Sequence, residues 1–195
     1  MNRKAFLTGL ALVGIIALAA WFRFYDLENY PSGLFPDQAA NGEDVLLILD
    51  GDVRPFYPRG NGREALFFLI QAGFVKTFGI GVWPMFAASA TVGLLTVIAT
   101  FFATRTFFGR LAGLLAALLL ATNHWHVTLS RTGFRAIMIP LCIAAFTAFV
   151  GYTIDAVRRG KRVQSLIYAA GAGASFAAGF YIYIAYRMMI GIVIG

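Results

Sequence analysis

Five charged side chains are the best candidates for chemistry in this sequence: Asp37, Arg63, Glu64, Arg131 and Arg135. A carboxylate can act as a general base toward a hydroxyl group, and arginine can bind phosphate oxygens through paired hydrogen bonds. Charges at membrane depth are costly unless they face water, a partner or a ligand. The set suits a phosphate on a lipid tail, with Asp37 as base. Structural pairing of these charges, or contact with anionic headgroups, is the alternative that spacing leaves open.

Three of these residues belong to a polar segment, residues 34–64, of an otherwise apolar chain. Eight of the nine acidic residues lie between positions 23 and 64: Asp26, Glu28, Asp37, Glu43, Asp44, Asp50, Asp52 and Glu64. The chain as a whole is 59% hydrophobic, with a mean hydropathy of +0.75. Because soluble domains are about 45–50% apolar, the composition predicts an all-α, polytopic membrane protein.

The formal net charge of +7 could indicate nucleic-acid binding, but the positions of the cations argue against it. Outside the acidic segment, nearly every Lys or Arg lies at the end of an apolar run, where it sets orientation and contacts headgroups. We therefore expect membrane lipids, and no nucleic acid, as partners. The single cysteine, Cys142, lies inside an apolar run and can form no disulfide within the chain.

The first apolar run, residues 5–22, matches the about 17–25 residues of a membrane-spanning helix. A cleavable signal peptide is the alternative, with Ala17-Leu18-Ala19 as cleavage site. The run exceeds the usual hydrophobic region of about 7–15 residues, which favours a retained helix. Arg3 and Lys4 then hold the N-terminus in the cytoplasm, and residues 23–82 form the first extracytoplasmic loop.

This loop is predicted to contain two helices. Residues 37–49 read as a short helix on the membrane surface. Two prolines keep the following stretch extended as far as Asn61 and Gly62. These two residues can start a second helix at Arg63 or Glu64.

The second predicted helix, residues 64–79, decides the topology because it is short and polar for a membrane span. Placed along the outer surface, it leaves the cations of residues 105–110 and 158–162 in the cytoplasm, as the positive-inside rule favours. The membrane-spanning helices are then about five, formed by the first apolar run and by residues 84–104, 111–127, 136–156 and 163–183.

A second outer turn, residues 123–135, contains His124, His126 and both outer arginines. Two histidines two positions apart at a helix end point in different directions, which favours interfacial hydrogen bonding over metal binding. Nothing in this turn supports a divalent metal, so neither a metal nor another cofactor is expected.

Several motifs follow one another along the chain. After the N-terminal span come Asp37-Gln38, an amphipathic helix, Asn61-Gly62-Arg63-Glu64, Phe107-Phe108-Gly109-Arg110 and Ser130-Arg131-Thr132-Gly133-Phe134-Arg135. This order resembles the amino-terminal half of a GT-C glycosyltransferase, over essentially the whole chain. Within that superfamily it is most similar to bacterial relatives of the protein O-mannosyltransferases and of the lipid A aminoarabinose transferase.

The resemblance implies a multi-pass inner (plasma) membrane enzyme. Such an enzyme moves a sugar, with inversion, from a polyprenyl-phosphate donor to a protein, lipid or glycan acceptor outside the cytoplasm. By the same resemblance Asp37 is the base, and Arg63 and Glu64 lie near the donor phosphate. Two departures matter: Gln38 stands where Glu often follows the Asp, and the second outer turn has Arg135 and no carboxylate, which argues against a metal-dependent site.

A non-catalytic transporter or lipid-carrier-binding protein is the alternative function. A transporter predicts polar or broken helices at mid-membrane, whereas here the polar residues lie at the helix ends. Because the sequence stops in an apolar run shortly after Arg187, residues 1–195 are expected to be a partial GT-C transmembrane module that shows no sugar transfer by itself.

Overall fold

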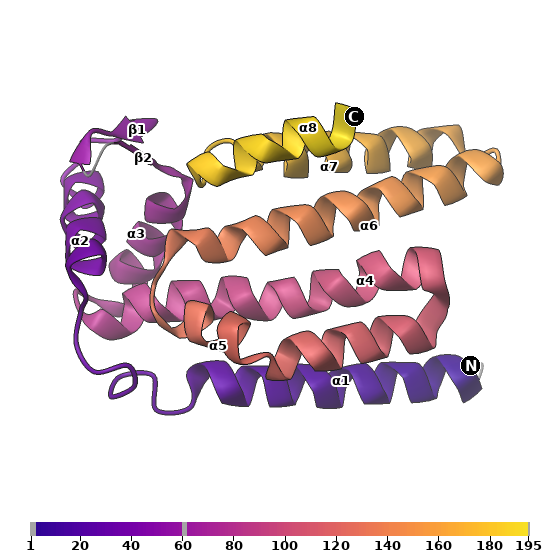
Figure 1. Ribbon diagram of the computed structural model, residues 1–195, viewed down its shortest axis with the longest axis horizontal. Helices are drawn as coiled ribbons and strands as arrows, with labels where there is room; N and C mark the ends of the chain where they lie inside the picture. The colour runs from indigo at the N-terminus through magenta and orange to yellow at the C-terminus, as the bar shows by residue number, and fades with distance from the viewer. Residues whose placement is uncertain (1–2, 60–61, 195) are drawn as a thin grey trace.

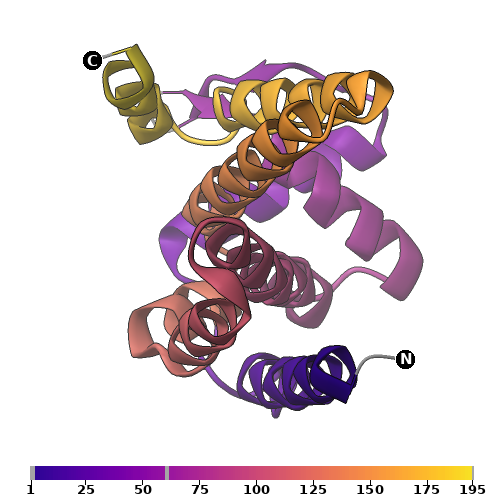
Figure 2. The ribbon, with the colours of Figure 1, turned by 90° about the vertical axis from the view of Figure 1, so that its right-hand side faces the viewer.

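The computed structural model describes residues 3–59 and 62–194, most of which are helical. The long helices are α1 (Arg3–Phe24), α4 (Val82–Thr122), α6 (Met138–Arg158) and α7 (Arg162–Gly179). They lie roughly side by side, and α2 (Pro36–Leu49) and α3 (Leu66–Phe78) stand across one end of them (Figure 1). Seen almost end-on, α1, α4, α6 and α7 follow one another from bottom to top (Figure 2).

The polar segment ends in a short antiparallel strand pair and not in the start of a helix. Strand β1 (Phe56–Tyr57) pairs with β2 (Arg63–Glu64), with Phe56 opposite Glu64. The prediction that a helix begins at Arg63 or Glu64 is therefore wrong by two to three residues, because both are held extended by β1 and α3 begins only at Leu66. Asn61, the proposed helix start, lies outside the described residues.

Helix α4 contains a reversal of direction, visible as two antiparallel arms in Figure 1. The reversal occurs at Gly109, whose φ of 86° is readily adopted only by glycine. The arms correspond to the predicted runs 84–104 and 111–127, but the second arm ends at Thr122, before the predicted end at residue 127. Asn123 is extended there, and its side chain accepts a hydrogen bond from the backbone N–H of His126, which starts α5 (His124–Arg131).

Three helices of the described chain are long and apolar enough to cross a membrane: α1, α4 and the segment Arg135–Arg158, which joins the 3₁₀ turn η2 (Arg135–Ile137) to α6. Helix α7, the last predicted run, is not among them, so the count of about five spans stays a prediction. The N-terminus, the α4 reversal and the α6–α7 connection lie at the same end of the molecule, opposite α2 and α3 (Figure 1).

The main apolar core lies where α2, α3, the start of α4 and the start of α6 meet. Phe67, Phe68 and Phe86 are fully buried there, together with Tyr186 of the turn η3 (Ile184–Met188), which is followed by the short α8 (Met189–Ile194). Elsewhere the long helices expose many large apolar side chains, as expected where lipid replaces water as the solvent. The core therefore fixes α2 and α3 against the helix ends.

Candidate substrate-binding site

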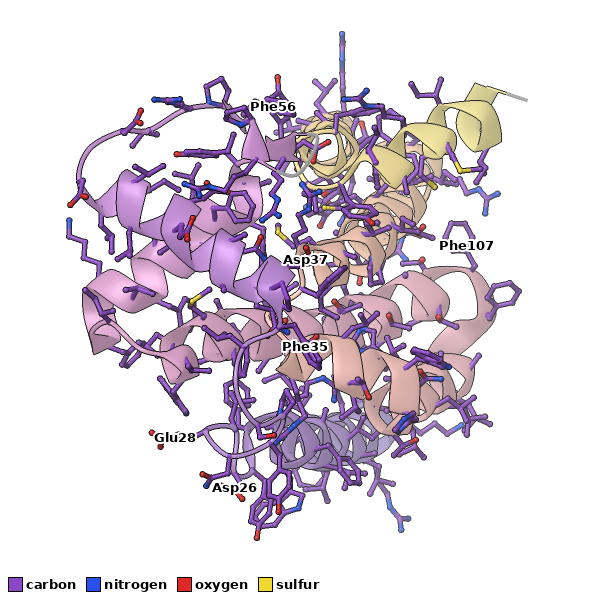
Figure 3. All side chains as sticks on the ribbon, turned by 60° about the vertical axis from the view of Figure 1, so that its left-hand side comes forward. Asp26, Glu28, Phe35, Asp37, Phe56 and Phe107 are labelled. Atoms are coloured by element: carbon purple, nitrogen blue, oxygen red, sulfur yellow. The ribbon has the colours of Figure 1, made fainter. Side chains whose placement is uncertain are left out.

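Asp37 lies in the first turn of α2. Pro36 opens this helix, and the side-chain carbonyl of Gln38 accepts a hydrogen bond from the backbone N–H of Phe35 at 2.9 Å. Figure 3 shows Asp37 at the end of α2 that faces the helix bundle, whereas Asp26 lies well away from it, beside α1. The Asp37 side chain is 72% exposed, so a ligand can reach its carboxylate.

Strand β2 brings Arg63 against the same turn of α2. Its Nη1 donates to Asn41 Oδ1 at 2.8 Å and to the backbone carbonyl of Asp37 at 3.4 Å. Its Nη2 lies 3.8 Å from Asp37 Oδ1, which is too long for a hydrogen bond. The guanidinium is thus positioned mainly by Asn41, and the Asp37 carboxylate is held only loosely.

Glu64 and Arg135 form the second, tighter ion pair of the site. Arg135 Nη1 donates to Glu64 Oε2 at 2.8 Å, and both side chains are largely buried. The Arg135 guanidinium also stacks 5.0 Å from the ring centroid of Tyr183. Glu64 therefore lies behind Arg135 and orients it, and Tyr183 supports the guanidinium from another side.

These groups surround a small polar pocket of about 120 Å³, called here the arginine pocket. Its lining is Asp37, Asn41, Arg63, Phe134, Arg135 and Tyr183. An apolar pocket of about 420 Å³ adjoins it, lined by Phe35, Pro36, Asp37, Gln38, Thr128, Leu129, Thr132 and Phe134. Asp37 and Phe134 line both pockets, so the carboxylate stands at the boundary between a polar and an apolar compartment.

Arg131, the remaining predicted substrate-binding residue, is not brought to the arginine pocket. It donates to the backbone carbonyls of Phe22 at 2.9 Å, Tyr30 at 2.7 Å and Asp26 at 3.3 Å. Burial lowers the pKa of Arg131, and the Asp26 carboxylate opposes that shift. The structure therefore gives Arg131 a connecting position, between α5 and the segment that follows α1.

A second arginine in the same region, Arg23, is completely buried. It donates to the carbonyls of Ala19 and Ala121 and to Nδ1 of His126 at 2.8 Å, so α1, α4 and α5 are joined through one side chain. Burial and the Arg23 charge lower the pKa of His126 to about 4, and its ring is neutral at neutral pH. The sequence analysis assigned Arg23 no role.

Three other acidic residues of the loop are engaged elsewhere. Arg59 forms ion pairs with Glu43 and, at 3.0 Å, with Asp44, and Arg54 pairs with Asp52 at 2.7 Å. Within the described residues no group of three or more His, Cys, Asp or Glu side chains is placed to hold a metal ion. Asp37 is thus the exposed carboxylate that faces the pocket.

Gln38 and Asn41 each have a structural role that the sequence analysis did not identify. The Gln38 side-chain amide donates to the backbone carbonyl of Thr132 and so fastens α2 to the second outer turn. A glutamate at that position could not donate when ionised, which accounts for glutamine. Asn41 could have been identified, because it lies one helical turn from Asp37 and so shares its face. No motif or spacing around Tyr183 in the sequence indicated that this residue belongs to the site.

No protein-family model, curated protein or solved structure matches this chain. The similarity to GT-C enzymes therefore rests on the order of the motifs quoted above, and the function has to be argued from the geometry of the site.

Proposed function

We propose that the arginine pocket binds the phosphate of a polyprenyl-phosphate-linked sugar and that Asp37 acts as the general base for transfer of that sugar. The observation that carries this proposal is the position of Asp37, exposed on the wall shared by a polar pocket with two arginines and an apolar pocket. A lipid phosphate has the same division into a polar and an apolar part.

Both pocket arginines retain hydrogen-bond donors for a phosphate. Within the described residues, Arg63 and Arg135 each make their hydrogen bonds through Nη1. The Nε and Nη2 groups of each side chain can therefore form the two parallel bonds by which guanidinium holds phosphate oxygens. Asn41 and Glu64 hold the two arginines in place before the ligand arrives, which reduces the entropy lost on binding.

The apolar pocket suits the first isoprene units of the carrier. Phe35, Leu129 and Phe134 line the apolar pocket, and Phe134 also lines the arginine pocket. A chain lying there would pass its phosphate toward Arg63 and Arg135. This placement puts the sugar–phosphate bond beside Asp37.

The proposed reaction is a single displacement with inversion at the anomeric carbon. The acceptor hydroxyl loses its proton to the Asp37 carboxylate as its oxygen bonds to the anomeric carbon. The bond from that carbon to the phosphate oxygen breaks, and the added negative charge on the leaving phosphate is stabilised by Arg63 and Arg135. The acceptor, whether a protein, a lipid or a glycan, approaches from the exposed side of Asp37.

The membrane setting supports this assignment. The cations of the α4 reversal and of the α6–α7 connection lie at the end opposite the arginine pocket (Figure 1). Under the positive-inside rule that opposite end faces the cytoplasm. We therefore place the pocket at the outer surface of the inner (plasma) membrane of a multi-pass protein, where α2 and α3 lie along the interface.

The test is Asp37→Asn, which keeps the size of the side chain but cannot accept the proton. In native membranes we expect sugar transfer to fall by about 10²–10⁴, the range of general-base catalysis. Polyprenyl phosphate should bind the purified variant as well as the unaltered chain, since the arginines are intact. Normal transfer by Asp37→Asn in native membranes would refute its role as base, and binding without transfer by the unaltered protein in the same native membranes would favour a non-catalytic carrier-binding protein.

A further inference from the structure

A second polar pocket lies at the other end of the molecule, between the α4 reversal and the end of α6. Its volume is about 370 Å³, and its lining is Arg105, Thr106, Phe107, Gly151, Tyr152, Ile154, Asp155, Arg158 and Arg159. Figure 3 shows Phe107 at the far side of the molecule from Asp37. This pocket, called here the basic pocket, is therefore separate from the arginine pocket.

The basic pocket carries a net positive charge. It contains three arginines and a single carboxylate, Asp155, which binds Arg159 at 3.0 Å. Arg105 packs against the ring of Phe101, with its guanidinium carbon 5.8 Å from the centroid. Arg158 makes no hydrogen bond or ion pair within the described part of the chain. At least two cations are thus available to an anion.

The walls of the basic pocket are set by close packing of two helices. A Cβ at Gly151 of α6 would lie 2.4 Å from Oγ1 of Thr106 on α4, so only glycine allows this approach. The approach brings Arg105 of one helix toward the cationic end of the other. Two cations that are far apart in the sequence, Arg105 and Arg158, therefore line one cavity.

The surroundings of the basic pocket are apolar and exposed. Phe107 is 48% exposed, Ile154 40% and Val157 63%. These side chains lie on helices long and apolar enough to cross a membrane. A ligand at this position can therefore place an anionic group in the pocket and hydrocarbon chains along the neighbouring helix surfaces.

We propose that the basic pocket binds the phosphate headgroup of an anionic membrane phospholipid. Basic pockets between membrane helices near the cytoplasmic surface are suited to such headgroups. The phosphate lies between Arg105 and Arg158, Tyr152 belongs to the same lining, and the acyl chains follow Phe107 and Val157 into the bilayer. Binding there stabilises the contact between the α4 reversal and α6.

The experiment uses the purified chain in a non-ionic detergent, titrated with phosphatidylglycerol or phosphatidylcholine and followed by native mass spectrometry. Phosphatidylglycerol should bind more tightly. Arg105→Gln and Arg158→Gln should each weaken it about fivefold, the effect of one basic residue near an anionic lipid. Arg162→Gln is the matched control, because Arg162 is an exposed cation at the same end and outside the pocket.

Asp155→Asn provides a variant whose effect cannot come from misfolding. It releases Arg159 and removes the only carboxylate of the basic pocket, so phosphatidylglycerol should bind more tightly. Inorganic phosphate at the same concentration should not displace the lipid, since it lacks acyl chains. Equal losses in Arg162→Gln and the pocket variants, weaker binding by Asp155→Asn, or equal affinity for phosphatidylcholine would each overturn the proposal, and displacement by phosphate would show a free-anion site instead.

Discussion

Two pairs of arginines lie at the same end of this molecule and use their donors differently. Arg23 donates mainly to backbone carbonyls of α1 and α4. Arg131 donates to backbone carbonyls of α1 and of the segment after it. Arg63 and Arg135 face carboxylates and line a pocket. A carbonyl of the fold cannot leave its arginine without local unfolding, whereas the Nε and Nη2 donors of Arg63 and Arg135 make no hydrogen bond within the described residues and can reach a ligand. The comparison shows that the first pair joins elements of the fold, and it supports our proposal that the second pair binds a ligand.

The largest expected effect is on stability, from Arg23→Met. The variant keeps an apolar stem but removes the donors that join α1, α4 and α5, and the buried Nδ1 of His126 loses its hydrogen bond. Since hydrogen bonds to charged groups contribute about 1.5–3 kcal/mol each, we expect the free energy of unfolding to fall by about 3 kcal/mol. Thermal unfolding in detergent measures this, with the exposed Arg3→Met on the same helix as control. An unchanged melting temperature in Arg23→Met would show that Arg23 does not stabilise the fold, and the proposed difference between the two pairs of arginines would fail.

A smaller effect, on binding, is expected from Glu64→Gln. The glutamine carbonyl oxygen can still accept the hydrogen bond from Arg135, so the guanidinium stays oriented. The negative charge that repels a phosphate is removed, so the affinity for polyprenyl phosphate should rise about tenfold, equivalent to about 1.4 kcal/mol. Glu43→Gln is the control, because Glu43 pairs with Arg59 outside the pocket. Weaker binding by Glu64→Gln would mean that Arg135 needs its carboxylate partner in order to face the ligand.

The smallest expected effect is a dependence of stability on pH through His126. The pKa of His126 is lowered to about 4 in the folded chain, against 6.5 ordinarily, so between these values the unfolded chain binds a proton that the folded chain does not. Stability is therefore lost as the pH falls through that window. His126→Gln, which keeps an acceptor for Arg23, should make the melting temperature less sensitive between pH 7 and pH 5 than His124→Gln, a change at an exposed position. Equal sensitivity in both would exclude His126 as the cause.

The sequence was sufficient for the features that depend on local pattern. Apolar runs predicted the long helices, and the interval between the runs 84–104 and 111–127 contains the reversal of α4 at Gly109. The helix predicted for residues 37–49 agrees closely with α2, which covers Pro36–Leu49. Of the five grouped charges, the structure brings Asp37, Arg63, Glu64 and Arg135 together, and it places Arg131 elsewhere.

The features that depend on tertiary contacts were beyond local pattern. Arg63 and Glu64 pair with β1 because of that neighbouring segment, not because of their own helix propensity. Arg131 is four residues from Arg135, yet it faces the chain after α1 while Arg135 faces Glu64. The side-chain directions of two arginines in one short turn are set by partners about 70 to 110 positions away in sequence, and spacing contains no information about those partners.

The most direct test compares Arg135→Lys with Arg131→Lys, measuring polyprenyl-phosphate affinity and melting temperature for both. Lysine keeps the charge but cannot form the paired bonds of a guanidinium. We predict that Arg135→Lys weakens binding about tenfold, about 1.4 kcal/mol, with little change in melting temperature. Arg131→Lys should lower the melting temperature and leave the affinity unchanged. Weaker binding in Arg131→Lys together with normal binding in Arg135→Lys would contradict the account.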